Sequence, residues 1–174
     1  MDRKKAVLQG SLFELNAISA LQEKFPDAIF FNNVTVYSHV LQKDTQVDVI
    51  MLHSKGIFVI ELKDWRDYIE GEYNDVYWAG KGRAKSTLDV FNPLDQNFIH
   101  CRALWLKAFD AGVHLAPFYN FVCVPNGTQV YSQCKEVMNL DSLINAISRC
   151  IIKSSFNFDL FSLYSKVCSC WGLV

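Results

Sequence analysis

The chain has 174 residues and a formal net charge of −1, with 51% apolar and 20% charged residues. This composition excludes a disordered tail, and the length predicts one domain over residues 1–174 with a sizeable core. The nearly neutral charge excludes a protein that coats nucleic acid without specificity, because such proteins are strongly basic. No apolar stretch approaches the ~20 residues that span a bilayer, so we expect no membrane partner.

The N-terminus and the cysteines predict where the protein resides. Residues 1–16 begin with basic side chains, but polar and acidic residues follow at once, so the apolar segment of a secretory signal is missing. Six cysteines lack C-x-x-C spacing, and several fall in apolar patterns: Cys101, Cys123, Cys134, Cys150, Cys168 and Cys170. Cysteine commonly serves as a small buried hydrophobe. We therefore expect reduced thiols in a cytoplasmic protein.

The first third of the chain predicts one helix followed by three strands. Apolar residues at helical spacing indicate a helix over residues 5–25, which the sequence Phe25-Pro26-Asp27 ends. Apolar and β-branched runs predict strands over residues 28–37, 45–52 and 57–63. A tight connection, His53-Ser54-Lys55-Gly56, joins the second strand to the third, with glycine for the turn.

The remaining elements complete an α+β domain. A hairpin over residues 68–79 turns near Asn74-Asp75, and residues 80–91 form a polar loop. Asn92 as N-cap and Pro93 at the first helical position start a helix that runs to about Phe109. The last predicted elements are a strand over 117–124, a turn at 125–127, a short return strand over 128–131, and helices over 140–153 and 158–170. This order predicts one mixed sheet flanked by helices, with a C-terminal helical extension over about 139–174.

The second and third strands place two carboxylates opposite each other. If His53–Gly56 is the loop of an antiparallel hairpin, Leu52 pairs with Ile57 and paired residue numbers sum to 109. A two-residue loop inside this segment gives the same register. Asp48 then lies opposite Glu61 on the same face, with Cβ atoms ~4.5–5.5 Å apart. The inference depends on the loop, because a slip of one residue would separate the two side chains.

The same register puts Gln46 opposite Lys63 and so predicts one polar cluster at the end of an apolar ribbon. Two adjacent carboxylates destabilise a sheet unless a cation offsets their repulsion. Their hard oxygens suit Mg²⁺ or Mn²⁺, which keep water ligands and accept phosphate oxygens. A neighbouring lysine can orient the attacking water or stabilise developing negative charge. The pattern therefore indicates a metal-dependent phosphodiesterase site.

A wider series of motifs resembles a known family. Asp, followed by Glu-x-Lys on the next strand, resembles the PD-(D/E)xK nuclease superfamily. Four segments in order resemble the nuclease-related domain, NERD: Gln46-Val47-Asp48, the GIFVIELKDW segment at 56–65, Tyr77-Trp78 and the NPLDQN segment at 92–97. The resemblance covers about residues 8–130. It implies a restriction-endonuclease-like αβββαβ core and Mg²⁺-dependent cleavage of nucleic acid, with DNA as the expected substrate.

The resemblance also implies roles for individual residues. Asp48 and Glu61 would be metal ligands and Lys63 the catalytic lysine. Glu14, on the first helix, stands where the family often has Gly-Glu and would add a ligand through water, although Phe13 replaces the glycine here. Two further residues resemble the helical Q-x-x-x-Y/H element of related nucleases, and their i, i+4 spacing puts them on one helix face: Gln96 and His100.

Simpler interpretations remain open for each of these residues. In these interpretations Glu61 and Lys63 only form a salt pair at a solvated strand end, and Glu14 is only a surface residue. Gln96 only packs or caps, and His100 is a structural histidine. The basic loop residues Lys81, Arg83 and Lys85 either contact phosphate or form a solvated loop.

Two other functions also fit the sequence. A catalytically inactive module would keep the fold to bind nucleic acid or a protein partner, and a structural subunit would act only as an oligomer. The C-terminal aromatic residues leave a homodimer contact open. The sequence does not separate single from double strands or endonuclease from exonuclease cleavage.

Overall fold

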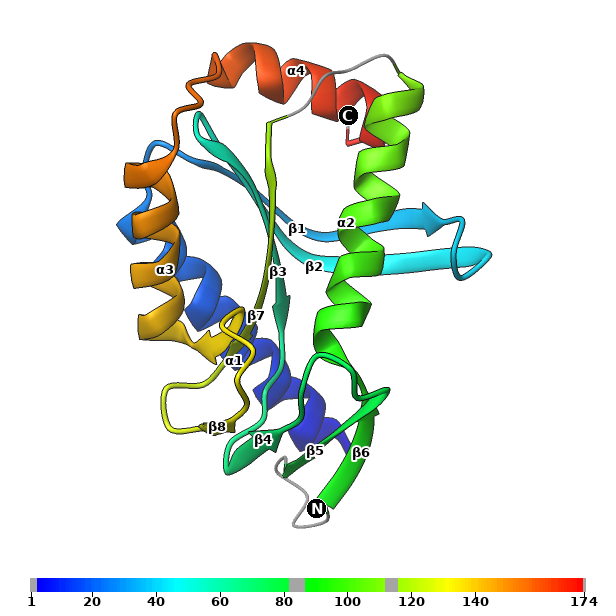
Figure 1. Cartoon of the computed structure of the whole chain (residues 1–174), viewed down its shortest axis with the longest axis vertical. Coiled ribbons are helices and arrows are strands. Elements are labelled where there is room, and N and C mark those ends of the chain that lie inside the picture. Colours follow the sequence, from blue (N-terminus) through cyan, green and yellow to red (C-terminus); the bar gives the residue numbers. More distant parts are fainter. Residues whose placement is uncertain (1–2, 82–86, 112–115, 174) are drawn as a thin grey trace.

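The computed structural model describes residues 3–81, 87–111 and 116–173. Figure 1 shows two β-sheets with helices packed around the larger one. In chain order the elements are α1 (Arg3–Lys24), β1 (Ile29–Ser38), β2 (Lys43–His53), β3 (Gly56–Leu62), β4 (Tyr68–Glu70), β5 (Tyr77–Lys81), β6 (Thr87–Phe91), α2 (Pro93–Asp110), β7 (Phe118–Val124), β8 (Gln129–Tyr131), β9 (Val137–Asn139), α3 (Leu140–Lys153) and α4 (Leu160–Trp171). None of the helices in this described part is long and apolar enough to cross a membrane.

The larger sheet is mixed, as predicted. Its strand order is β1-β2-β3-β7-β9, in which β2 is antiparallel to both β1 and β3, and β3, β7 and β9 are parallel. The connection from β3 to β7 contains α2 and the first three strands of the smaller sheet, β4, β5 and β6, because a parallel pair requires a crossover. Apart from these three inserted strands, the order α1-β1-β2-β3-α2-β7 is the αβββαβ order of a nuclease-like core, and α3 and α4 follow as the C-terminal helices.

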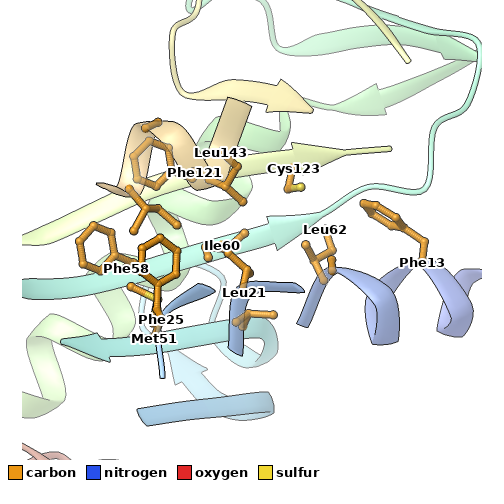
Figure 2. Packing of buried hydrophobic residues seen from close by; sticks show 14 residues of the cluster. Phe13, Leu21, Phe25, Met51, Phe58, Ile60, Leu62, Phe121, Cys123 and Leu143 are labelled. Atoms are coloured by element: carbon orange, nitrogen blue, oxygen red, sulfur yellow. The ribbon is translucent and has the colours of Figure 1, made fainter. Parts of the chain in front are cut away.

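Helices cover both faces of this sheet. On one face Phe13 and Leu21 of α1 and Leu143 of α3 pack onto a floor that includes Ile60 and Phe121, as Figure 2 shows. On the other face α2 and α4 cover the second apolar cluster. The indole N–H of Trp171 donates to the carbonyl of Leu104 at 3.0 Å and joins α4 to α2. The sheet is thus buried on both faces, which explains why β3 is apolar at almost every position.

The start of α2 has the predicted capping. The side chain of Asn92 accepts hydrogen bonds from the N–H groups of Leu94 and Asp95, at 2.9 and 3.4 Å, and Pro93 occupies the first turn. The Asn92 amide also donates to the carbonyls of Tyr73 and Asp75. The cap therefore fixes both the first residue of α2 and its position against the preceding hairpin.

The ribbon of β1 and β2 bends where it leaves the sheet (Figure 1). Val47 belongs to the cluster beneath α2 and α4, whereas Val49, two residues later, belongs to the cluster beneath α1 and α3. Positions two apart in a flat strand would share a face. The register is the same on both sides of the change, so no residue is inserted. Asn33, which stands across from Asp48, has a left-handed φ of 55° and marks the bend.

Two predictions for the middle of the chain were wrong in part. Residues 87–91 of the predicted polar loop form β6, which pairs with β5 and buries Trp78 at the centre of the smaller sheet. Residues 129–131 do not return along β7 but pair in parallel with β4. The smaller sheet therefore has the order β6-β5-β4-β8, and the single predicted sheet is replaced by two. Strand β9 was not predicted.

Candidate active site

The end of β3 carries the residues that the sequence placed in a site. Val49 pairs with Ile60 and Leu52 with Ile57, which is the predicted register with a sum of 109. The strands extend to His53 and Gly56, so the loop has two residues. Asp48 and Glu61 lie directly beyond the last backbone pair, and the negative charge of Glu61 acts to raise the pKa of Asp48.

Asp48 is held by the backbone of the neighbouring strand. Its Oδ2 accepts a hydrogen bond from the N–H of Leu62 at 2.8 Å. Burial, followed by the negative charge of Glu61, raises the pKa of Asp48 from 3.8 to about 6, although the Leu62 N–H and Lys63 act in the opposite direction. The carboxylate thus lies in a partly desolvated position beside a second negative charge, where a cation would be strongly favoured.

Glu61 is the best-connected carboxylate of the cluster and is only 2% exposed. Its Oε1 lies 2.7 Å from Lys63 Nζ and also accepts a hydrogen bond from Gln96 Nε2 at 2.7 Å. The Gln96 side chain accepts in turn from Lys63 Nζ at 3.0 Å. The three side chains form a closed triangle that fixes the ammonium group of Lys63 at the end of the strand.

His100 approaches the other oxygen of Glu61. Its Nδ1 lies 3.3 Å from Glu61 Oε2, and its Nε2 lies 2.9 Å from the hydroxyl oxygen of Thr45 on β2. Burial alone would raise the pKa of Glu61, but His100 and Lys63 together lower it below its ordinary value. The Nδ1 and Oε2 atoms face each other but do not form a well-aligned hydrogen bond, and within the described residues neither has another hydrogen-bond partner. The first turns of α2 therefore provide two side chains to Glu61, as the i, i+4 spacing predicted.

The remaining predicted residues lie at different distances from this cluster. Glu14 on α1 is half-buried. Burial, followed by the negative charges of Asp64 and Glu61, raises the pKa of Glu14, so its carboxylate is close enough to the cluster to interact with it electrostatically. Lys81 is in β5 and forms an ion pair with Asp67 at 3.0 Å. Arg83 and Lys85 lie outside the described residues.

One member of the predicted cluster is elsewhere. The side chain of Gln46 donates to Asn33 Oδ1 at 2.7 Å and is exposed, instead of meeting Lys63. The reason is the bend at Asn33 and Asp48, which turns the outer part of the ribbon away from the strict alternation that the prediction assumed.

The structure adds polar residues that the sequence analysis did not single out. Asn97 is a fully buried residue of α2, and its amide donates to the carbonyls of Val59 and Phe121 and to the side chain of Asn120. Asn120 donates back to the carbonyl of Leu94. These bonds anchor the first turns of α2 to β3 and β7. An asparagine on the apolar face of a predicted helix was the available signal.

The residues fit a small hard cation in part. Among the described residues no group of three or more His, Cys, Asp and Glu side chains forms a ready metal cage. Mg²⁺ does not require one, because it commonly uses one or two carboxylates together with water and substrate phosphates. The buried Oε2 of Glu61, which faces only His100 Nδ1 among the described residues and accepts no hydrogen bond, and the neighbouring carboxylate of Asp48 offer this kind of donor set.

A mixed sheet covered by helices, with Glu61 and Lys63 at the end of its central strand β3 and Asp48 beside them on β2, defines a nuclease-like α+β domain. The model of the nuclease-related domain (NERD) family matches residues 9–125. The chain therefore belongs to this family. An uncharacterized protein of Bacillus anthracis is 30% identical over 122 residues, which are 69% of this chain and 54% of the relative. The chain thus spans about half the length of that curated relative. No solved structure matches the chain.

Proposed function

We propose that this protein is a metal-dependent nuclease that hydrolyses phosphodiester bonds of nucleic acid, with DNA as its substrate. The observation that carries the proposal is the triangle that buried Glu61 forms with half-buried Lys63 and Gln96, beside the carboxylate of Asp48. It combines a carboxylate pair for a cation with a fixed ammonium group for a phosphate, within the family that PD-(D/E)xK motifs characterise.

The side chains divide the work as follows. Asp48 and Glu61 would hold Mg²⁺ or Mn²⁺, and Glu14 would assist through water. When bound, such an ion supplies a water of lowered pKa and positive charge for the phosphate oxygens. Lys63, held by Glu61 and Gln96, stabilises the negative charge that develops on the phosphate and orients the attacking water. The backbone bond from Leu62 keeps Asp48 in position before any ligand arrives.

The catalytically inactive module is the second candidate, because one observation favours it. Glu61 Oε1 is already occupied by Lys63 and Gln96, and this closed network stabilises the fold without any cation. In that case the same surface would bind nucleic acid or a protein without cutting. The two functions differ in whether Glu61 Oε2 and the Asp48 carboxylate bind a metal ion.

The cysteines support a cytoplasmic location as part of the proposal. All six are free thiols in the structure. Burial raises the pKa of both Cys101 and Cys123 to about 12, which makes these two thiols unreactive. A chain with unpaired, buried cysteines suits a reducing compartment.

The deciding experiment is a cleavage assay with purified protein, Mg²⁺ or Mn²⁺, and labelled double-stranded DNA, single-stranded DNA and RNA. Asp48→Asn and Glu61→Gln remove one charge each at nearly constant shape. Glu23→Gln, at an exposed position of α1, is the matched control. We expect cleavage that EDTA abolishes, that the control retains and that both site variants lose. Equal cleavage by the parent and both site variants would contradict the proposal, and binding without cleavage would support the inactive module.

A further inference from the structure

The outer edge of β7 is only half covered. Strand β3 pairs with β7 from Phe118 to Cys123, whereas β9 pairs only with Val122–Val124 on the other side. The N–H of Ile57 donates to the carbonyl of Pro117, and the N–H of Val122 donates to the carbonyl of Glu136. Since backbone groups alternate in direction along a strand, the N–H and C=O groups of Phe118 and Asn120 face the open side. No strand of the described chain pairs with them.

This edge is the floor of a cleft between two helices. A cleft of about 540 Å³ has Phe118–Phe121 along its floor, Leu94 and Phe98 of α2 on one wall and Cys150 of α3 on the other. A second hollow of about 370 Å³ continues past Tyr119 along α3. A sheet edge at the base of a cleft with helical walls is the geometry in which proteins add a peptide as an extra strand.

The α2 wall exposes aromatic side chains. Phe98, Trp105 and Phe109 are 59%, 46% and 61% exposed and lie at i, i+7 and i+11, on one side of the helix. The rings of Trp105 and Phe109 stack with centroids 5.1 Å apart. A third hollow of about 240 Å³ between Phe98 and Trp105 reaches Phe118. The apolar surface is therefore continuous with the open edge.

The charges around these hollows indicate the chemistry of the occupant. Four cationic side chains line them, against two carboxylates: Arg102, Lys135, Arg149 and Lys153 against Asp95 and Glu136. The local balance is thus +2, while the whole chain has a net charge of −1. The hydroxyl of Tyr73 also donates a hydrogen bond to Glu136, which partly offsets the negative charge of that carboxylate. An acidic ligand is favoured over a basic one.

We propose that the open edge of β7 binds an extended, acidic peptide segment of another protein, which adds a strand in line with β9. Its backbone would pair with Phe118 and Asn120, its apolar side chains would pack on the aromatic wall of α2, and its carboxylates would face Arg149 and Lys153. The surface is on the side of α2 away from Gln96 and His100, so the proposal does not depend on nuclease activity. A second copy of this chain fits less well, because a two-fold contact would bring two surfaces of the same net charge together.

The test uses three fluorescent ten-residue peptides in anisotropy titrations with the full chain. The first alternates valine and glutamate, the second has lysine for glutamate, and the third is the first with N-methyl groups on alternate residues. We expect the acidic peptide to bind, the lysine peptide to bind at least about tenfold more weakly, and the N-methylated peptide to lose binding. The double variant Arg149→Glu/Lys153→Glu should reverse the preference, while Lys43→Glu, on the far ribbon, should not.

The protein side of the strand pairing is tested by Phe118→Pro. It removes an N–H that β3 does not use, so the ladder to β3 survives, and circular dichroism checks that the fold is kept. This variant should bind the acidic peptide at least about tenfold more weakly. Equal binding of the N-methylated peptide, or no binding of the acidic peptide up to about 1 mM, would overturn the proposal. A dimer in sedimentation experiments that Phe118→Pro dissociates would overturn it too, because the edge would then hold a second copy.

Discussion

The backbone N–H of Leu62 donates to Asp48 Oδ2 at 2.8 Å, so a side chain of β2 becomes the acceptor where the backbone pairing of β2 and β3 ends. The bond fixes the Asp48 carboxylate beside Glu61 through the fold itself. It also leaves two negative groups close together in a partly desolvated place, which is the reason for the raised pKa of Asp48. The site is therefore strained electrostatically before a cation or substrate arrives.

The first prediction concerns the stability of Asp48→Asn. The variant keeps an acceptor for Leu62 but loses the charge that Glu61 repels. Because the pKa of Asp48 is about 6 in the fold and 3.8 is its ordinary value, the folded parent binds more protons between these values and loses stability as pH rises through them. Above pH 6 we expect the variant to unfold at a higher temperature than the parent, with a free energy of unfolding that is larger by about 1 kcal/mol after solvent screening. Near pH 4 the two proteins should unfold at nearly the same temperature.

Thermal unfolding of both proteins from pH 4 to pH 8 measures this difference. A difference that stays constant with pH would show that the Asp48 charge is not destabilising. Adding Mg²⁺ or Mn²⁺ at pH 7.5 should raise the unfolding temperature of the parent more than that of the variant, because a ligand that binds the folded state stabilises it. An equal rise in unfolding temperature for both proteins would show that Asp48 is not a metal ligand.

The second prediction concerns Gln96, which contacts Glu61 and Lys63 at once. Gln96→Ala leaves the 2.7 Å ion pair in place but frees the ammonium group to move. We expect cleavage to fall by about 10–100-fold, as for residues that orient catalytic or ligand groups, with little change in unfolding temperature. Gln22→Ala, on the exposed face of α1, serves as the control in the same assay. If Gln96→Ala cleaves as fast as the parent, Gln96 has only a packing role.

Much of this arrangement was predictable because local signals determine it. The β2–β3 loop has few registers available, so the positions of Asp48 and Glu61 followed from counting. Asn92 and Pro93 are strong signals for the start of a helix, and the predicted helix over residues 140–153 matches α3. These features depend on residues close together in the sequence.

The parts that could not be predicted depend on distant contacts. The bend at Asn33 displaces Gln46 from the cluster, and the sequence does not require it, because asparagine tolerates a left-handed φ but adopts an extended one equally well. The contact of Thr45 with His100 joins residues 55 positions apart. Strand β8 has three residues and pairs in parallel with β4, so its own sequence is too short to specify its partner. The roles of the site residues remain predictions until activity is measured.

The third prediction separates two contributions of Asn92. Asn92→Ala removes the cap of α2 and the bonds to Tyr73 and Asp75, and should lower the free energy of unfolding by about 1–2 kcal/mol. Asn92→Asp keeps the capping oxygen and adds a charge that the helix N-terminus favours, but it cannot donate to the two carbonyls. We expect its stability to lie between those of the parent and the alanine variant. Chemical denaturation measures all three, and equal losses for both variants would show that the cap contributes nothing.

The last prediction concerns substrate binding by Lys81, Arg83 and Lys85. A net charge of −1 means that attraction for phosphate must be local, and these residues come shortly before the helix that carries Gln96. Changing all three to alanine should weaken nucleic-acid binding and reduce the slope of log K against log[salt] by roughly 0.7–0.9 for each phosphate that the variant no longer neutralises. Because Lys81 already pairs with Asp67 at 3.0 Å, its single variant should change the slope least. The cleavage rate of bound substrate should survive, since the proposed metal ligands are untouched.

The control for this prediction has the same change in total charge at other positions, with Lys24, Lys55 and Lys166 changed to alanine. A general effect of net charge would lower affinity equally in both triple variants, whereas phosphate contacts would change the slope only in the first. Binding is measured with a labelled duplex and a single strand between about 50 and 200 mM salt, the range over which counterion release dominates. If the first triple variant keeps the parent slope, these residues form a solvated surface and the cations that bind phosphate lie elsewhere.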